Sequence, residues 1–330
     1  MSGFTTWRST NTKGNPWLAD KSKPVAEPRV AVIIPCYNSA RFVGEAIESA
    51  LAQTYPAVDV IVINDGSTDD LFDKLVAYRD RIVLINQANR GLAAARNRGL
   101  DASNTEFVAF LDADDRWHPD KIARQVAFLQ TNPESPLVYT ERRWIDEHGQ
   151  PISPREYFVL VRGRCVAELA RHNTIAPSTV LIRRTALGEA RFDPSTTPCE
   201  DWDLWLRLSQ SSEIGLIEAD LTDYRIHESN MSRNQERMVS ATVQVMNNLL
   251  DRTPSLSVRR IAKRHRRECL LLLGHLKYER GCLAEARHYY CRGLGAAGPV
   301  ELLRLMATCL PAPIYRTSQA LWRAARGRVN

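Results

Sequence analysis

The chain has 330 residues, enough for about two domains of the usual ~100–200 residues each. With 44% hydrophobic and 25% charged residues, the composition excludes a wholly disordered protein. No apolar run approaches the ~18 residues that a membrane-spanning helix needs, and the first residues lack the basic stretch and apolar core of a secretory signal. We therefore expect a cytoplasmic protein.

The net charge of +6 is unevenly distributed along the chain. Residues 257–330 contain 15 Lys and Arg against 4 Glu, a net charge of +11, which leaves −5 for residues 1–256. A basic end on an acidic body indicates an anionic partner for that end.

The pattern of apolar residues changes sharply at Arg29. Residues 1–28 are rich in Ser, Thr, Asn, Lys and Pro without hydrophobic periodicity, which predicts a flexible leader. After it, segments of helical spacing alternate with four short apolar runs: Val30–Ile34, Val58–Ile63, Ile82–Ile85 and Phe107–Leu111. This alternation predicts an α/β fold with a mostly parallel central sheet flanked by helices.

The second half of the chain begins irregularly and ends helical. Prolines interrupt residues 133–232, where one clear helix is expected at Asp201–Gln210, and from about Gln235 the chain is helical and basic. Residues 267–300 resemble one tetratricopeptide repeat, whose small residues allow two helices to pack closely. Because such repeats need about three stacked copies, we expect a helical hairpin that closes the preceding domain.

Polar residues gather where the predicted strands end, which is where open α/β sheets bind ligands. The segment Asp112-Ala113-Asp114-Asp115 follows the fourth strand. Three carboxylates in four residues repel one another unless a cation compensates, and a hard divalent ion that carries substrate phosphates suits them. Asp65 and Asp69, after the second strand, are explained equally well as caps of a turn and a helix.

These segments together resemble glycosyltransferase family 2. The match is dense over residues 29–121, through VAVIIPCYNSARFVGEAIESALAQTYPAVDVIVINDGSTDD, NRGLAAARNRGL and FVAFLDADDRWHPDKI, and continues to about 232 through CEDWDLWLRL and YRIHESNMS. The resemblance implies the type A glycosyltransferase fold for a catalytic domain over residues 29–232. The basic helical region over 233–330 lies outside the resemblance. The resemblance also implies transfer of a sugar, with inversion, from a nucleotide-sugar, preferably a UDP-sugar. The implied acceptor is a hydroxyl of a glycan or lipid-linked molecule, in cell-surface polysaccharide synthesis.

The resemblance assigns roles to residues at the matching positions. Asp65 would accept a hydrogen bond from the base, although Asn64 replaces an Asp that many members have, so the base identity stays open. Asp114 would bind Mn²⁺ or Mg²⁺ that bridges the donor diphosphate, with His227 near the same ion. The donor nucleotide is expected against Pro35, Tyr37, Asn38, Asp65, Arg96 and Asp112.

Sugar transfer also needs a base for the acceptor hydroxyl, while a metal stabilises the negative charge on the leaving diphosphate. Glu200 and Asp201 open the helix in the second half of the domain, where the family has an acidic pair. We assign the base to Asp201 and a supporting or acceptor-binding role to Glu200. The alternative is an ordinary helix start, where acidic residues favour the helix dipole.

Two other functions are compatible with an acidic α/β site. A sugar nucleotidyltransferase would carry a Gly-rich loop after the first strand, but Pro35–Ser39 contains no Gly. A non-catalytic module that binds sugar-nucleotides or partners would not need Asp112, Asp114 and Asp201 together.

The basic C-terminal region favours an anionic membrane surface as a partner. Arg259–Arg267 holds six Lys and Arg in nine positions, and Ile314–Arg328 places Leu321 and Trp322 seven residues after Ile314 and Tyr315, on one helical face with arginines around it. Such a helix suits the headgroup layer, which would hold the enzyme peripherally at the inner face of the cell membrane. The alternative is that this face packs on the protein's own helices. Nucleic acid is not expected, because the acidic body repels phosphates and no recognition motif is present.

Overall fold

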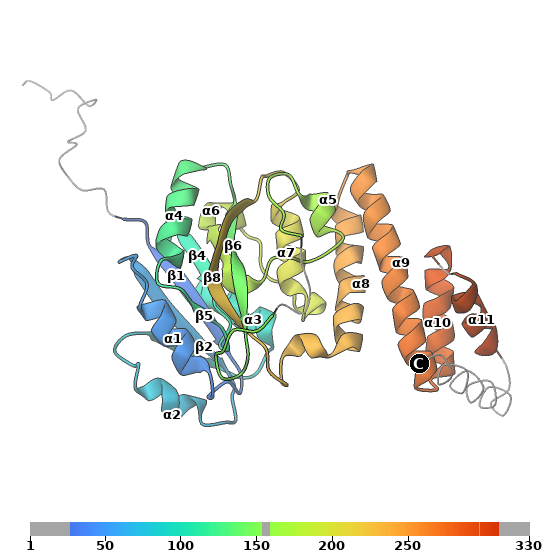
Figure 1. Cartoon of the computed structure of the whole chain (residues 1–330), viewed down its shortest axis with the longest axis horizontal. Helices are drawn as coiled ribbons and strands as arrows, with labels where there is room; N and C mark the ends of the chain where they lie inside the picture. The colour runs from blue at the N-terminus through green and yellow to red at the C-terminus, as the bar shows by residue number, and fades with distance from the viewer. Residues whose placement is uncertain (1–26, 154–158, 297, 310–330) are drawn as a thin grey trace, which may run out of the picture.

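The computed structural model describes residues 27–153, 159–296 and 298–309 (Figure 1). Nearly all of the predicted leader and the whole of the predicted amphipathic segment Ile314–Arg328 lie outside the described residues. Within the described part, one eight-stranded sheet has the order β3-β2-β1-β4-β7-β6-β8-β5.

The first half of this sheet is the predicted parallel one. The strand β1 pairs in parallel with β2 and β4, and β2 pairs in parallel with β3. These strands are β1 (Val30–Cys36), β2 (Val58–Asp65), β3 (Val83–Gln87) and β4 (Phe107–Phe110). Each coincides with one of the predicted apolar runs to within a few residues, so the βαβ prediction is confirmed.

The second half of the sheet is mixed. Strand β7 is antiparallel to both β4 and β6, and β5 is antiparallel to β8, whereas β6 and β8 are parallel. The strands are β5 (Arg116–Trp117), β6 (Leu137–Ile145), β7 (Val180–Arg183) and β8 (Gly215–Arg225). Because prolines and irregular connections separate these strands, their periodicity in the sequence is weak.

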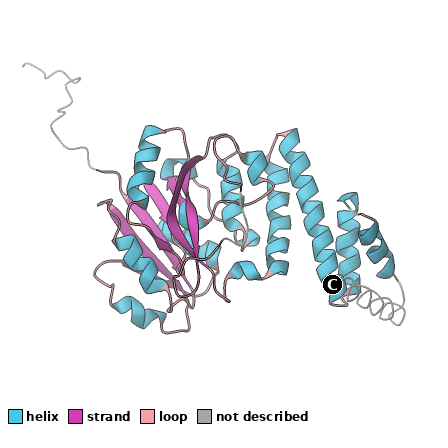
Figure 2. Ribbon diagram, viewed as in Figure 1, coloured by secondary structure: helices cyan, strands magenta, loops and turns pink. Residues whose placement is uncertain are grey.

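Helices cover both faces of the sheet (Figure 2). One core cluster joins one face to α1 (Val43–Leu51), α2 (Leu71–Val76) and α4 (Lys121–Thr131). Another joins the opposite face to α3 (Leu92–Asp101), α7 (Glu200–Leu208) and α8 (Gln235–Arg252). Gly99 lets α3 approach β1 closely, since a Cβ there would lie 2.4 Å from Ile33. The short helices are α5 (Val166–Leu169) and α6 (Arg184–Leu187).

The C-terminal helices follow one another as a stack beside the sheet domain (Figure 1). They are α8, α9 (Leu256–Glu279), α10 (Leu283–Gly293) and α11 (Pro299–Ala307). The predicted hairpin is formed by α9 and α10, and Gly274 permits its close packing because a Cβ there would lie 2.8 Å from the Tyr290 ring. Since α8 and the first part of α9 share this core, the C-terminal region is packed onto the sheet domain through both helices.

The basic run Arg259–Arg267 lies on α9, and some of its side chains form hydrogen bonds within the protein. Arg259 donates to the carbonyl of Thr253 at 3.2 Å, and Arg266 donates to Oδ1 of Asn247 at 3.1 Å. Three other cations of the run, Arg260, Lys263 and Arg264, are exposed. Among the described helices, none has the length and apolar character that crossing a membrane requires.

Candidate active site

The loops after β1 and β2 are joined at the carboxyl edge of the sheet. The backbone N–H of Asn38 donates to Oγ of Ser67 at 3.0 Å, and the N–H of Thr68 donates to Oδ1 of Asn38 at 2.8 Å. Tyr37 is 52% exposed. Pro35 is buried within β1, opposite Ile63. Tyr37 and Asn38 therefore lie at the rim where a donor is expected, while Pro35 lies beneath it.

Asp65 holds the loop between β3 and α3. Its carboxylate accepts hydrogen bonds from Nε2 of Gln87 at 2.7 Å and from the backbone N–H groups of Arg90 at 2.9 Å and Gly91 at 2.8 Å. Since an ionised carboxylate accepts about four hydrogen bonds, about one position is left for a nucleotide base. The predicted contact with the base stays a prediction, and the structure adds a loop-positioning role.

A buried arginine connects the two predicted acidic segments. Arg96 lies on α3 and is 2% exposed; it donates to Oδ1 of Asp112 at 2.6 Å and to Oε1 of Glu200 at 2.6 Å. Although burial lowers its pKa, the charges of Asp112 and Glu200 raise it more, so the guanidinium remains charged. Arg96 therefore joins the end of β4 to the start of α7. Direct contact between Arg96 and the nucleotide stays a prediction.

Asp201, beside Glu200, lies in an environment that suits a base. The side chain is 7% exposed and accepts a hydrogen bond from Nδ2 of Asn173 at 3.0 Å. Burial, and then the neighbouring Glu200, raise the pKa of Asp201 to about 7. A carboxylate whose pKa lies near neutrality can accept a proton efficiently at physiological pH.

The side chains of Asp114 and His227 are in contact. Asp114 follows β4 and His227 follows β8, so the two residues are far apart in sequence. Oδ2 of Asp114 lies 2.9 Å from Nε2 of His227, and Nδ1 of His227 lies 2.8 Å from Oγ of Ser229. Asn230 also donates to Oδ2 of Asp114 at 3.3 Å. The two predicted metal ligands thus face each other, as they must if both bind one ion.

This pair fits a metal that arrives with its substrate. Within the described residues, no group of three or more His, Cys, Asp or Glu side chains could hold an ion. Mg²⁺ and Mn²⁺ take oxygen ligands, and Mg²⁺ in particular is often held by one or two carboxylates together with substrate phosphates. Asp114 and His227 would supply two ligands to the ion, and the diphosphate of the nucleotide-sugar and water would supply the others.

The three strand-end carboxylates do not form one cation site, which corrects the interpretation of Asp112-Ala113-Asp114-Asp115. Arg96 neutralises Asp112, and only Asp114 faces His227. Asp115 is 1% exposed and accepts the backbone N–H of Arg225 at 2.9 Å. Burial, followed by the neighbouring Asp114, raises the pKa of Asp115 well above its ordinary value. Asp115 therefore belongs to the interior.

Arg225 is the residue that the sequence interpretation missed. It is 1% exposed, and it donates through Nε to the carbonyl of Asp114 at 2.8 Å and through Nη2 to Oε2 of Glu45 at 2.7 Å. Its position gave a signal, because Arg225 stands two residues before His227 in the segment YRIHESNMS.

Comparison with known proteins shows the family to which this chain belongs. The model of the family described as glycosyl transferase family 2 matches residues 31–189. A putative teichuronic acid biosynthesis glycosyltransferase of Bacillus subtilis, TuaG, is 30% identical over 66% of this chain and 86% of that protein. The chain belongs to glycosyltransferase family 2. The Escherichia coli UDP-Glc:alpha-D-GlcNAc-diphosphoundecaprenol beta-1,3-glucosyltransferase WfaP is 33% identical over 62% of this chain and 80% of that protein.

Other relatives are longer than the matched region. An uncharacterised glycosyltransferase of Rickettsia felis is 34% identical over 61% of this chain. The match covers only 33% of the length of the Rickettsia felis protein. The match to a Rickettsia typhi relative that is 32% identical covers 65% of that protein.

Solved structures confirm the type A glycosyltransferase fold. Staphylococcus aureus TarS, in complex with UDP-GlcNAc, has a TM-score of 0.59 and 17% identity over 84% of each chain. The mannosyltransferase PcManGT from Pyrobaculum calidifontis, in complex with GDP-Man and Mn²⁺, has a TM-score of 0.59 and 19% identity, over 89% of this chain and 83% of that one. At these identities the likeness shows the fold alone.

Proposed function

We propose that this protein is a metal-dependent inverting glycosyltransferase that moves a sugar from a UDP-sugar to a hydroxyl of a glycan or lipid-linked acceptor in cell-surface polysaccharide synthesis. The observation that supports the proposal is the bridge from Asp112 through Arg96 to Glu200, which joins the carboxylate after β4 to the residue that precedes Asp201. Family membership supports the reaction, and the names of TuaG and WfaP support a polysaccharide or lipid-linked setting.

The donor side of the proposed site consists of the loops after β1 and β2 and of the pair Asp114 and His227. Tyr37, Asn38 and Asp65 would contact the nucleoside, and Asp112 would lie near the ribose. Asp114 and His227 would hold Mn²⁺ or Mg²⁺. When bound, such an ion stabilises the negative charge of the departing diphosphate.

The acceptor side depends on Asp201. Its carboxylate takes the proton of the acceptor hydroxyl while that oxygen bonds to the anomeric carbon and the bond from this carbon to the diphosphate oxygen breaks. Attack from the face opposite the leaving group inverts the anomeric configuration. Asn173 holds Asp201 through a hydrogen bond of 3.0 Å, and Arg96 holds the preceding residue, Glu200, through one of 2.6 Å.

The basic C-terminal region would associate with an anionic membrane surface. Arg260 and Lys263 are exposed on α9 and contribute positive charge, and Ile314–Arg328 would supply the apolar face. Truncation after Leu310 should weaken salt-sensitive binding to anionic vesicles without stopping transfer to a soluble acceptor. Equal co-sedimentation with and without residues 311–330 would contradict this assignment.

A panel of nucleotide-sugars tests the reaction class. Because a ligand that binds the native state raises the melting temperature, a UDP-sugar should stabilise the protein in the presence of Mn²⁺ and not in the presence of chelator. Stabilisation by a nucleoside triphosphate together with a sugar phosphate would favour the nucleotidyltransferase alternative. Binding of a UDP-sugar without its turnover would favour the non-catalytic module.

A further inference from the structure

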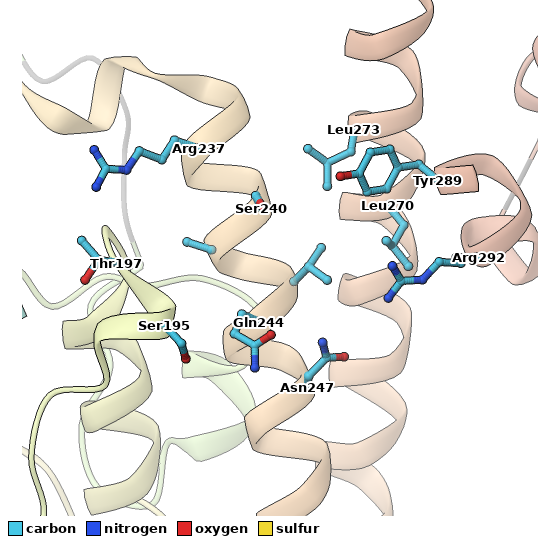
Figure 3. A pocket seen from close by; sticks show the side chains of 12 residues that line it. Ser195, Thr197, Arg237, Ser240, Gln244, Asn247, Leu270, Leu273, Tyr289 and Arg292 are labelled. Carbon is cyan, nitrogen blue, oxygen red and sulfur yellow. The ribbon is translucent and has the colours of Figure 1, made fainter. Parts of the chain in front are cut away.

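A groove of about 310 Å³ crosses helix α8 (Figure 3). Its floor is a stripe of α8 that includes Arg237, Ser240, Gln244 and Asn247, spaced as residues on one helical face. One wall is the turn Ser195–Thr197, and the other comes from the hairpin of α9 and α10. The groove therefore lies between the segment that leads into α7 and the C-terminal region.

The groove is positively charged. Its lining contains Arg237 and Arg292 and, among the described residues that form it, no carboxylate. Within the described part of the chain, the Arg237 guanidinium has no hydrogen-bond or ion-pair partner, and Arg292 contacts only Nε2 of His288, at 3.3 Å. Guanidinium groups bind carboxylates and phosphates through paired hydrogen bonds. These two arginines thus remain available to an anion.

The amide of Asn247 is fixed with its donor group unused. Arg266 donates to Oδ1 of Asn247 at 3.1 Å. Because a guanidinium can only donate, this contact determines which end of the Asn247 amide faces Arg266. Nδ2 is left to donate to a ligand in the groove.

The amide of Gln244 is fixed in the opposite sense. Nδ2 of Asn248 donates to Asp193 at 3.1 Å and to Asp203 at 3.0 Å, so Oδ1 of Asn248 must accept the hydrogen bond from Nε2 of Gln244, at 3.0 Å. The acceptor Oε1 of Gln244 is left over. A fixed donor and a fixed acceptor one helical turn apart, with the hydroxyls of Ser195, Thr197 and Ser240 around them, suit the hydroxyl groups of a sugar chain.

One wall and the floor of the groove each contain a residue that is close in sequence to the proposed site. Thr197 stands four residues before Asp201, so their Cα atoms lie within about 14 Å of each other. Arg237 stands ten residues after His227, near the start of α8. A glycan whose reacting hydroxyl contacts Asp201 could extend into the groove.

We propose that this groove binds an acidic part of the acceptor glycan, bearing carboxylate or phosphate groups, at a distance from the reacting hydroxyl. The inference rests on the proposed glycosyltransferase function and specifies its acceptor class. Arg237 and Arg292 bind the anionic groups, and Asn247 and Gln244 bind the neighbouring sugar hydroxyls.

Titration of the full chain with oligosaccharides, followed by ligand-observed NMR, tests the proposal. The probes are tetragalacturonate, maltotetraose bearing one phosphate, and neutral maltotetraose. At least one acidic probe should bind saturably, about tenfold or more tighter than the neutral one, as expected when charge-assisted hydrogen bonds form. The acid that binds identifies the anionic group, and binding of neither acid would overturn the proposal.

Three variants locate the binding. The double variant Arg237→Gln, Arg292→Gln should bind the acidic probe about tenfold or more weakly than the wild type does. Asn247→Asp keeps the acceptor for Arg266 but replaces the donor with a negative charge, so it should lose binding while remaining folded. Arg260→Gln, an exposed arginine of α9 outside the groove, should bind as the wild type does. Equal binding in all variants would overturn the proposal.

Separate titration with UDP and Mn²⁺ distinguishes the two proposals. If acidic oligosaccharides bind in the groove but UDP does not bind, the glycosyltransferase function fails and the groove site remains. If UDP binds with Mn²⁺ and no acidic probe does, only the groove inference fails.

Discussion

The Nη1 atom of Arg96 lies 2.6 Å from Oε1 of Glu200, and its Nη2 atom lies 2.6 Å from Oδ1 of Asp112. Arg96 and Glu200 are 2% and 1% exposed. One buried guanidinium thus links the acidic segment after β4 to the acidic pair that opens α7. The two carboxylates can share this end of the sheet because one cation lies between them.

Replacing Arg96 should destabilise the fold. Arg96→Met leaves Glu200 buried without its cation, so the free energy of unfolding should fall by about 3–5 kcal/mol in urea titration. Arg96→Lys keeps the charge but cannot bond both carboxylates with a planar fork, and should lose less. Arg41→Met, which breaks the exposed pair with Glu147, should cost less than about 1 kcal/mol. Equal losses in Arg96→Met and Arg41→Met would show that the bridge is not structural.

The sequence predicts the half of the fold that follows simple periodicity. The runs that become β1 to β4 are apolar and β-branched, and the helices between them have regular spacing, so each element is recognisable locally. Strands β6 and β7 are separated by a long irregular connection, and β5 has only two residues. Their pairing depends on contacts between distant segments, which periodicity does not reveal.

The candidate site, like the fold, could be predicted from the sequence only in part. The motifs predict five acidic and histidine side chains that the structure brings to one end of the sheet: Asp112, Asp114, Glu200, Asp201 and His227. What each side chain contacts could not be predicted. The hydrogen bond from Arg96 to Glu200 joins residues 104 positions apart. Asp115 is buried and Asp114 is not, although the two residues are adjacent in sequence.

The base assignment predicts the kinetics of Asp201→Asn. This change keeps the shape and an acceptor for Asn173 but cannot take up the proton. Turnover of the donor found in the panel should fall by roughly 10²–10⁴ in kcat, while donor affinity measured by calorimetry stays similar. The matched change Glu213→Gln, at an exposed carboxylate, should leave kcat unchanged. A parallel loss of donor affinity in Asp201→Asn would make Asp201 a nucleotide-binding or structural residue.

The raised pKa of Asp201 predicts a pH profile. Since burial raises its pKa to about 7, the base is protonated at lower pH, and kcat/KM should fall about tenfold for each pH unit below that value. Above it, kcat/KM should level off. A flat profile from pH 5 to 8 would exclude Asp201 as the base.

The same pKa has a consequence for stability. A carboxyl group whose pKa is higher in the folded than in the unfolded state binds more protons when folded, so it lowers stability as pH rises between the ordinary Asp value of 3.8 and about 7. Asp201→Asn should therefore raise the melting temperature relative to the wild type at pH 8, and this gain should shrink toward pH 4. A gain that is constant with pH would contradict the buried, shifted carboxyl group.

We propose that Asp114 and His227 hold a divalent ion together with a nucleotide diphosphate. Calorimetric titration with UDP, with Mn²⁺ and then with chelator, tests it most directly. UDP should bind the wild type about tenfold or more tighter with Mn²⁺, and this dependence should disappear in Asp114→Ala and weaken in His227→Ala, because each change removes a ligand. His148→Ala, at an exposed histidine, should behave as the wild type. Equal UDP affinity with Mn²⁺ and with chelator, or an undiminished Mn²⁺ dependence in Asp114→Ala, would contradict the account.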